Sequence, residues 1–218
     1  MLENKPVISI IGGTGNLGTG LAKRLAVKGY KVILGSRSEE KAEKSAAELK
    51  RALGVDLIRG MPNPEAVRGG DLIILTVVQS AHEAALKSLK EDLQGKILVD
   101  ATARIKFPNP KPPKPPSAPR RAQTLLGEGV RVVAAFQNVA AQSIADLEKE
   151  LESDVLVCAD DQEAAQQVID IIEELGMQAY YAGDLDAANT VEGLTALLVN
   201  INKYNDIHHA SIQVTGSE

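Results

Sequence analysis

The 218-residue sequence has few aromatic residues and a single cysteine. Four Tyr, two Phe and no Trp make up 3% of the chain. Proteins that bind nucleic acids stack bases on aromatic side chains and carry excess positive charge, whereas the net charge here is −5. The single Cys158 can form neither an internal disulfide nor a thiolate metal cluster. We therefore expect a protein that binds no nucleic acid and has no disulfide framework.

Long apolar runs are also missing. No stretch approaches the roughly 18 consecutive apolar residues that can span a bilayer, and residues 1–6 lack the apolar core of a signal peptide. With 44% hydrophobic and 24% charged residues, the composition is typical of a globular protein. These features predict a cytoplasmic protein without a membrane partner, built as one large domain with at most a small appendage.

Short apolar runs alternate with amphipathic segments along most of the chain. Strands are expected at 7–11, 31–34, 56–59, 72–78, 96–99, 131–135, 154–158 and 178–181. Helices are expected at 16–28, 39–53, 81–91, 162–175 and 187–209. This alternation predicts an α/β fold, with a Rossmann-like, doubly wound, mostly parallel sheet and a C-terminal helical cap.

Residues 107–119 interrupt the alternation, because they hold seven of the ten prolines. So much proline excludes a helix or a central strand, and we expect an extended insertion over the C-terminal edge of the sheet. Between Asp100 and Glu128 there are six basic residues and no acidic one: Arg104, Lys106, Lys111, Lys114, Arg120 and Arg121. Such a loop either attracts a polyanionic second ligand or is an ordinary solvated loop, and both interpretations stay open.

A glycine motif, Gly13-Thr14-Gly15-Asn16-Leu17-Gly18, directly follows the first expected strand and opens the first expected helix. We assign the first glycine to the tight turn, the second to close approach of a pyrophosphate, and the third to helix–strand packing. The free N–H groups at the helix start would then bind phosphate oxygens. In this context the motif predicts a dinucleotide site rather than a purely structural turn.

The end of the second expected strand distinguishes NADP from NAD. An NAD site carries an acidic residue there to bind the ribose hydroxyls, but this strand ends in Gly35-Ser36-Arg37. Ser36 can donate a hydrogen bond, and Arg37 and Lys41 supply positive charge suited to a 2′-phosphate. These residues predict NADP, the alternative being an ordinary solvated helix start.

Candidate groups for chemistry are few. Residues 76–78 would lie beside the nicotinamide ribose and residues 100–103 beside the ring, since both follow central strands. We interpret Asp100 as a turn or cap residue rather than a general acid. His82 begins a helix, and the adjacent histidines 208–209 lie on the final helix. None has metal-ligand spacing, so neither a metal site nor a catalytic side chain is predicted.

The motif at 11–18, together with residues 35–41, resembles the NADPH-dependent coenzyme F420 reductase family. That family is similar to the dinucleotide-binding half of 6-phosphogluconate dehydrogenase and to the cytoplasmic domain of membrane ferric reductases. The resemblance continues in order through 135–141, 154–161 and 191–202, and so spans nearly the whole chain. It implies hydride transfer between NADP and the deazaflavin coenzyme F420, a small-molecule substrate whose phosphate-linked glutamate tail would suit the basic loop.

The resemblance also assigns residues to each coenzyme. Residues 14–17 would hold the pyrophosphate, residues 137–139 would border the deazaflavin, and Val77, Ala103 and Ala141 would line the nicotinamide pocket. Together with the motif residues, the expected cofactor-binding set is Gly13, Thr14, Gly15, Asn16, Leu17, Gly18, Ser36, Arg37, Lys41, Thr76, Val77, Ala103, Gln137, Asn138, Val139 and Ala141. No catalytic side chain is expected, because the two coenzymes carry the chemistry.

We expect residues 1–183 to form the NADP-binding domain, with the proline-rich insertion at 104–119. Residues 184–218 would form a helical segment that closes the second-substrate pocket, and its apolar helix predicts a homodimer. Two alternatives stay open: reduction of another flavin, a quinone or a ferric chelate in the same pocket, and a non-catalytic NADP-sensing module. Scarce aromatics fit two rings stacked between small aliphatic walls, with Phe136 expected beside them.

Overall fold

The computed structural model describes residues 5–106 and 108–216, and Phe107 of the proline-rich segment lies outside them. The strands are β1 (Ile8–Ile11), β2 (Val32–Ser36), β3 (Ile58–Pro62), β4 (Leu72–Leu75), β5 (Ile97–Asp100), β6 (Arg131–Ala134), β7 (Val155–Ala159) and β8 (Ala179–Tyr181). The helices are α1 (Asn16–Val27), α2 (Glu39–Leu53), α3 (Asn63–Gly69), α4 (Gln79–Leu89), α5 (Ala118–Leu126), α6 (Ala141–Ala145), α7 (Gln162–Glu174) and α8 (Ala188–Asn205).

All eight strands of the described chain form one sheet, in the order β3-β2-β1-β4-β5-β6-β7-β8. Strands β1 to β6 are parallel, β7 is antiparallel to β6, and β8 is parallel to β7. The expectation of a doubly wound, mostly parallel sheet is therefore confirmed. The chain moves outward in opposite directions from β1, toward β2 and toward β4, and such a reversal opens a crevice at the carboxyl ends of the strands.

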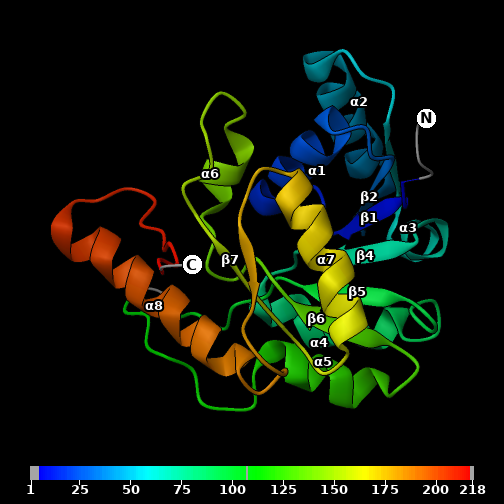
Figure 1. Ribbon diagram of the computed structural model, residues 1–218. Helices are drawn as coiled ribbons and strands as arrows, with labels where there is room; N and C mark the ends of the chain where they lie inside the picture. The colour runs from blue at the N-terminus through cyan, green and yellow to red at the C-terminus, as the bar shows by residue number, and fades with distance from the viewer. Residues whose placement is uncertain (1–4, 107, 217–218) are drawn as a thin grey trace.

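Helices cover both faces of the sheet, as Figure 1 shows. One apolar layer joins the sheet to α1, α2 and α7, through residues such as Leu25, Leu49 and Ile172. The other joins it to α3, α4 and α5, through residues such as Leu86 and Leu126. Each face of the sheet therefore has its own core, which explains why the central strands are mostly apolar. Within the described residues, no helix is long and apolar enough to cross a membrane.

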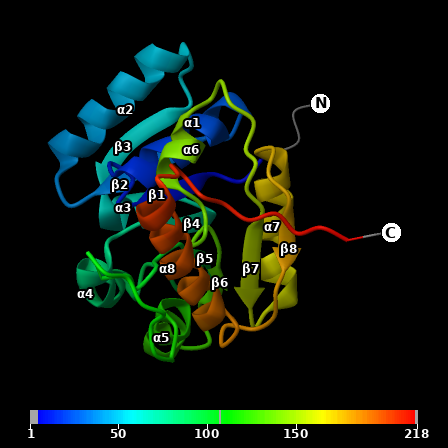
Figure 2. The ribbon, with the colours of Figure 1, turned by 90° about the vertical axis from the view of Figure 1, so that its left-hand side faces the viewer.

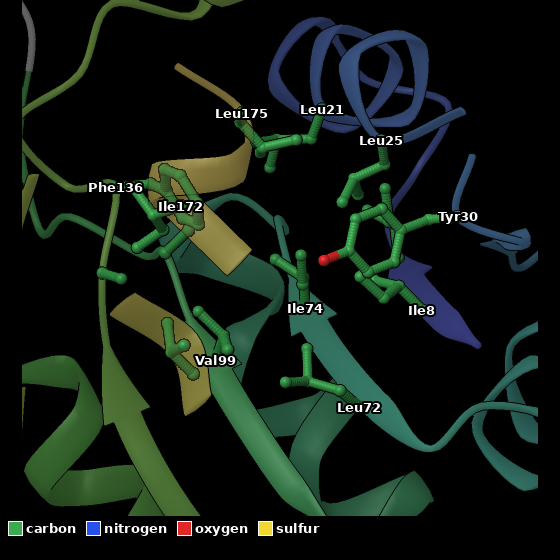
Figure 3. Packing of buried hydrophobic residues seen from close by; sticks show 14 of the residues in the cluster. Ile8, Leu21, Leu25, Tyr30, Leu72, Ile74, Val99, Phe136, Ile172 and Leu175 are labelled. Atoms are coloured by element: carbon green, nitrogen blue, oxygen red, sulfur yellow. The ribbon is translucent and has the colours of Figure 1, made fainter. Parts of the chain in front are cut away.

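Phe136 belongs to the first of these cores. Its side chain is 3% exposed and lies beside Ile172 and Leu175 of the α7 region (Figure 3). The backbone at Phe136 has a φ of 70°, so the chain turns sharply just after β6 and the ring packs beneath α7. The expectation that Phe136 lies beside the coenzyme rings is therefore wrong.

The sequence patterns miss three short helices, α3, α5 and α6. Helix α5 begins with Ala118 and Pro119, inside the proline-rich segment, because proline is tolerated in the first turn of a helix. Ser117 caps it by accepting a hydrogen bond from the Arg120 N–H, at 3.1 Å. At the other end of the chain, α8 stops at Asn205, and residues 208–209 lie beyond it. The placement of these histidines on the last helix is therefore wrong.

Helix α8 lies across the carboxyl ends of β5 and β6, in front of the sheet in Figure 2. The Thr195 hydroxyl donates a hydrogen bond to the Gln137 carbonyl, which follows β6, at 2.8 Å. The proline-rich segment runs along this helix, since the Asn200 side-chain amide donates to the Pro110 carbonyl at 3.1 Å. The insertion therefore contacts α8, and α8 in turn contacts the carboxyl edge of the sheet.

The single cysteine provides a test of the packing. The Cys158 thiol, on β7, is fully buried, and burial raises its pKa to about 11. Because the thiolate is the reactive form, we expect Ellman's reagent at mildly alkaline pH to leave the folded protein unmodified. In denaturant, labelling should proceed at the rate of unfolding, measured by release of the coloured thiolate. Rapid labelling in native buffer would contradict this burial.

Candidate functional site

The glycine loop connects the carboxyl end of β1 to the start of α1. Gly12 has a φ of 76°, and a Cβ there would lie 3.0 Å from Val77 Cγ1. A Cβ on Gly13 would lie 2.6 Å from the Ile10 carbonyl oxygen, and one on Gly18 would lie 2.6 Å from Gly13 Cα. The tight turn therefore depends on Gly13, as the motif predicts, and also on Gly12, whose left-handed backbone lies just before the motif. Gly18 has the packing role that the motif predicts.

Gly15 differs from these glycines because there is free space on the side where a Cβ would point. The nearest atom to a Cβ placed there is the Gly12 carbonyl oxygen, at 3.4 Å. Gly15 is the N-cap of α1, and in the described chain no side chain caps this helix and its first turn holds no acidic residue. The first N–H groups of a helix lack internal partners and carry partial positive charge. The loop therefore has the space and the polarity to hold a pyrophosphate.

Alanine at two of these glycines separates binding from folding. We expect Gly15→Ala to raise the dissociation constant for NADPH at least tenfold with an unchanged Tm, because the methyl group fills space that a phosphate would occupy. Gly18→Ala should lower the free energy of unfolding by about 2 kcal/mol, since its methyl group overlaps Gly13. Fluorescence titration and thermal unfolding measure the two effects. An equal loss of stability in both variants would contradict the assignment.

The predicted phosphate-binding cations lie where β2 gives way to α2. Ser36 ends β2, and its Oγ accepts a hydrogen bond from the Ser38 N–H at 3.2 Å. Ser38 caps α2 by accepting a hydrogen bond from the Lys41 N–H at 3.3 Å. The side chains of Arg37 and Lys41 are exposed. Because β2 is the neighbour of β1, these two cations lie beside the glycine loop, on the same edge of the sheet.

A cavity of about 460 Å³ lies at the carboxyl ends of β4 and β5. It is lined by Leu17, Thr76, Val77, Val78, Gln79, Ser80, Ala101, Thr102, Ala103 and Ile105. Seven of these residues are ones that the sequence places at this site (Leu17, Thr76, Val77, Val78, Ala101, Thr102 and Ala103), and sequence reasoning missed the other three, Gln79, Ser80 and Ile105. Among the predicted ones, Thr102 is 3% exposed, and its hydroxyl has no hydrogen-bond partner within the described chain. Small aliphatic walls suit a flat ring.

Four other predicted residues follow β6 and do not line this cavity: Gln137, Asn138, Val139 and Ala141. Gln137 is 4% exposed, and its side-chain amide donates to the Asp100 carbonyl at 2.8 Å, while its Oε1 has no partner in the described residues. The Asn138 side-chain amide donates to the Asp154 carbonyl at 2.7 Å. Asn138 therefore holds the start of β7, and the contacts of these four residues with a second coenzyme stay predictions.

A buried histidine–aspartate pair joins α4 to β5. His82 Nε2 donates a hydrogen bond to Asp100 Oδ2 at 2.6 Å, and the side chains are 9% and 0% exposed. Asp100 Oδ1 accepts a hydrogen bond from the Thr102 N–H at 3.0 Å, which is the turn role predicted for Asp100. Sequence reasoning missed His82 as its partner. The strand order could have indicated it. Because β4 and β5 are neighbours, Asp100 at the end of β5 meets α4, the helix that follows β4.

A second cavity, of about 370 Å³, lies against this pair. Its lining includes His82, together with Glu83, Arg104 and Arg121. Gln79 and Thr102 line both cavities, so Thr102 stands between the pocket beside the glycine loop and the pocket beside His82.

Two of the six basic residues of the loop are bound internally. Arg104 Nε donates to Glu192 Oε2 at 2.7 Å, and the two side chains are 8% and 0% exposed. Arg120 pairs with Asp160 and Asp186. The exposed basic residues are Lys106, Lys111, Lys114 and Arg121. The positive charge that this loop offers to a ligand is therefore smaller than the sequence count implies.

Comparisons with known proteins show the family to which this chain is related. The family described as NADP oxidoreductase, coenzyme F420-dependent, matches residues 7–104. The F420-dependent NADP reductase of Methanothermobacter thermautotrophicus is 35% identical over 95% of this chain and 94% of its own length. That of Methanocaldococcus jannaschii is 37% identical over 97% and 99%. A hypothetical protein from Sinorhizobium meliloti shares the fold, with a TM-score of 0.72 and 23% identity over 86% of this chain and 90% of its own.

Proposed function

The chain belongs to the family of coenzyme F420-dependent NADP oxidoreductases, and we propose that its glycine loop, its β2 tip and the 460 Å³ cavity serve hydride transfer between NADP(H) and F420. It is an oxidoreductase with two small-molecule redox substrates. The observation that carries the proposal is their arrangement: cations, phosphate loop and small-walled cavity follow one another along a single edge of the sheet, over β2, β1 and β4.

The order of these three parts matches the order of the 2′-phosphate, pyrophosphate and nicotinamide in NADP. Arg37 and Lys41, with Ser36, would bind the 2′-phosphate through charge-assisted hydrogen bonds. The open face of Gly15 leaves the room that a pyrophosphate requires, and the α1 N-terminus supplies donors. The nicotinamide would then lie in the cavity between Val77 and Ala103.

The second coenzyme would lie next to the nicotinamide, under α8. Two buried polar atoms without partners in the described chain, Thr102 Oγ1 and Gln137 Oε1, flank this region and fit a ligand with polar edges. The two coenzymes supply the redox chemistry. The protein binds them with reacting atoms roughly 3–3.5 Å apart and excludes water, for which small side chains are suited. We assign residues 1–183 to the NADP-binding domain and 184–218 to the segment that closes the second pocket.

The exposed lysines of the proline-rich loop would attract the anionic tail of F420. We expect Lys111→Glu combined with Lys114→Glu to raise the KM for F420 about three- to tenfold at low salt, and much less at high salt, since exposed charges are screened. The KM for NADPH should not change. An unchanged KM for F420 at low salt would identify the loop as an ordinary solvated insertion.

The direct test is the rate of NADPH oxidation with F420 and, under matched conditions, with FMN. We expect turnover with F420 and little with FMN. Turnover with FMN alone would exclude F420 as the acceptor. Tight NADPH binding without turnover with F420, FMN, a quinone or a ferric chelate would instead favour a sensing module.

We also propose a homodimer that forms through α8. The outer face of this helix exposes Leu197, Ile201 and Tyr204, at 52%, 40% and 71%. Exposed apolar side chains gathered on one helix face commonly mark an interface. Light scattering coupled to size exclusion measures the mass, and Ile201→Glu should convert a dimer to a monomer. A monomeric wild-type protein would contradict this assignment.

A further inference from the structure

Thr102 lines both cavities, and His82, which lines the 370 Å³ cavity, is hydrogen-bonded to the buried Asp100. The His82–Asp100 hydrogen bond is 2.6 Å long, and Asp100 also accepts the Thr102 N–H at 3.0 Å. The Thr102 hydroxyl has no partner in the described chain, although it is 3% exposed. A buried hydroxyl that lacks a partner costs about 1–3 kcal/mol, so its presence at a cavity wall points to a ligand atom.

The reaction itself requires a proton. NADPH gives up a hydride, which is one hydrogen with two electrons, and oxidised F420 must take a proton as well as that hydride to become reduced F420. The balanced reaction is therefore NADPH plus F420 plus H⁺ giving NADP⁺ and reduced F420. A site that excludes water from two stacked rings needs a protein path for this proton.

We propose that Thr102, His82 and Asp100 form a proton relay from the 370 Å³ cavity to the second coenzyme, an inference that rests on the proposed function. The Thr102 hydroxyl, on the wall shared by both cavities, donates its proton to the coenzyme and receives one from His82 through water in the 370 Å³ cavity. In the reverse reaction each proton moves the opposite way. Thr102 is the group that contacts the coenzyme, and His82 and Asp100 act through it.

The surroundings of His82 suit this role. Asp100 accepts a hydrogen bond from Nε2 and so holds the ring in one orientation. The structure shows no hydrogen-bond partner for Nδ1 within the described residues, and His82 lines the cavity from which it would be reprotonated. The other charged groups of that cavity are Glu83 of α4, Arg121 of α5, and Arg104, whose charge is balanced by Glu192.

Substitution of Thr102 tests the contact with the coenzyme. Thr102→Val keeps the shape and removes the hydroxyl, so we expect kcat to fall at least tenfold, with the KM for NADPH within twofold of wild type. Thr102→Ser should restore most of the rate. The matched control is Thr124→Val, whose hydroxyl is on an exposed helix position. If Thr102→Val is as fast as the control, the relay is wrong.

Substitution of His82 tests the proton source. We expect His82→Ala to lower kcat at least tenfold, and added imidazole to restore part of it, which loss of a merely structural side chain would not allow. The rate should also fall in heavy water for the wild-type protein, and this solvent isotope effect should change in the variant. Absence of both imidazole rescue and a solvent isotope effect would overturn the proposal.

Binding gives a readout independent of turnover. In nitrogen-15 spectra, the ring signals of His82, identified by their loss in His82→Gln, should shift when F420 binds with NADP⁺. This shift should shrink in Thr102→Val although F420 still binds. Unperturbed His82 signals on binding would contradict the relay. If the wild-type protein and the variants reduce F420 at equal rates, only the relay is wrong. If the wild-type protein does not reduce F420 at all, the proposed function is wrong.

Discussion

Arg37→Asp is expected to raise the KM for NADPH about 100-fold or more while the KM for NADH stays within about threefold. A charge-assisted hydrogen bond contributes about 1.5–3 kcal/mol, and 1.4 kcal/mol corresponds to a factor of ten. The substituted carboxylate also repels the 2′-phosphate, so both effects act in the same direction. NADH has no phosphate there, and Asp at the tip of a second strand can accept hydrogen bonds from its ribose hydroxyls.

Steady-state kinetics with both nucleotides measure this change in preference. Lys44→Asp is the matched control, because it makes the same charge change at an exposed position seven residues further along, on α2. Arg37 is exposed, so the Tm of the variant should stay close to that of the wild type. A KM that rises equally for NADPH and NADH would refute the role of Arg37 at the 2′-phosphate and would leave Lys41 and Ser36 as the remaining candidates.

The parts of this protein that sequence predicts well are those set by local pattern. The continuous apolar run of β4 is required by burial on both faces, and Ser38 caps α2 in the structure as its position before the helix predicts. The positions of Arg37 and Lys41 are also set locally, because both lie at one strand–helix junction, whereas their role at a phosphate stays a prediction. Local pattern misleads where proline is tolerated: Pro119 lies in the first turn of α5 rather than in an extended loop.

The parts that sequence does not predict depend on which elements become neighbours. His82 and Asp100 are 18 residues apart and meet only because β4 pairs with β5. Each residue taken alone is ordinary, a helix-start histidine and a strand-end aspartate. Arg104 likewise counts as a loop cation in the sequence, but its partner Glu192 lies 88 positions away, on α8. Charge counted along a chain therefore overstates the charge available to a ligand.

The Arg104–Glu192 pair leads to the second large prediction: Arg104→Leu should lower the free energy of unfolding by about 3–5 kcal/mol at neutral pH. Glu192 is fully buried, and besides Arg104 Nε it accepts the Ala118 N–H at 2.5 Å. Arg104 also donates to Asn189 Oδ1 at 2.9 Å. Removing the arginine leaves a buried carboxylate without its counter-charge and detaches α8 from the loop that follows β5.

The stability of the Arg104→Leu variant should also depend on pH in a definite direction. Burial raises the pKa of Glu192, and the Ala118 N–H and Arg104 guanidinium oppose that rise, so loss of Arg104 must raise the pKa further. In the variant, the folded protein then retains a proton that the unfolded chain releases. Its stability therefore falls as the pH rises through the interval between the unfolded and folded pKa values, and the deficit relative to wild type shrinks in mild acid. A deficit that is constant with pH would contradict an unpaired Glu192.

Two further variants separate charge from packing. Arg104→Leu combined with Glu192→Leu should recover most of the lost stability, because replacing a whole buried pair by apolar groups is often neutral. Arg120→Leu should cost only about 0–1 kcal/mol, since its partners Asp160 and Asp186 are 43% and 72% exposed. Denaturant unfolding, with Cys158 labelling as a second probe, measures all three. If the double variant is no more stable than Arg104→Leu, then the contacts of Arg104 with α8 and the loop, rather than the buried charge, stabilise this end of the molecule.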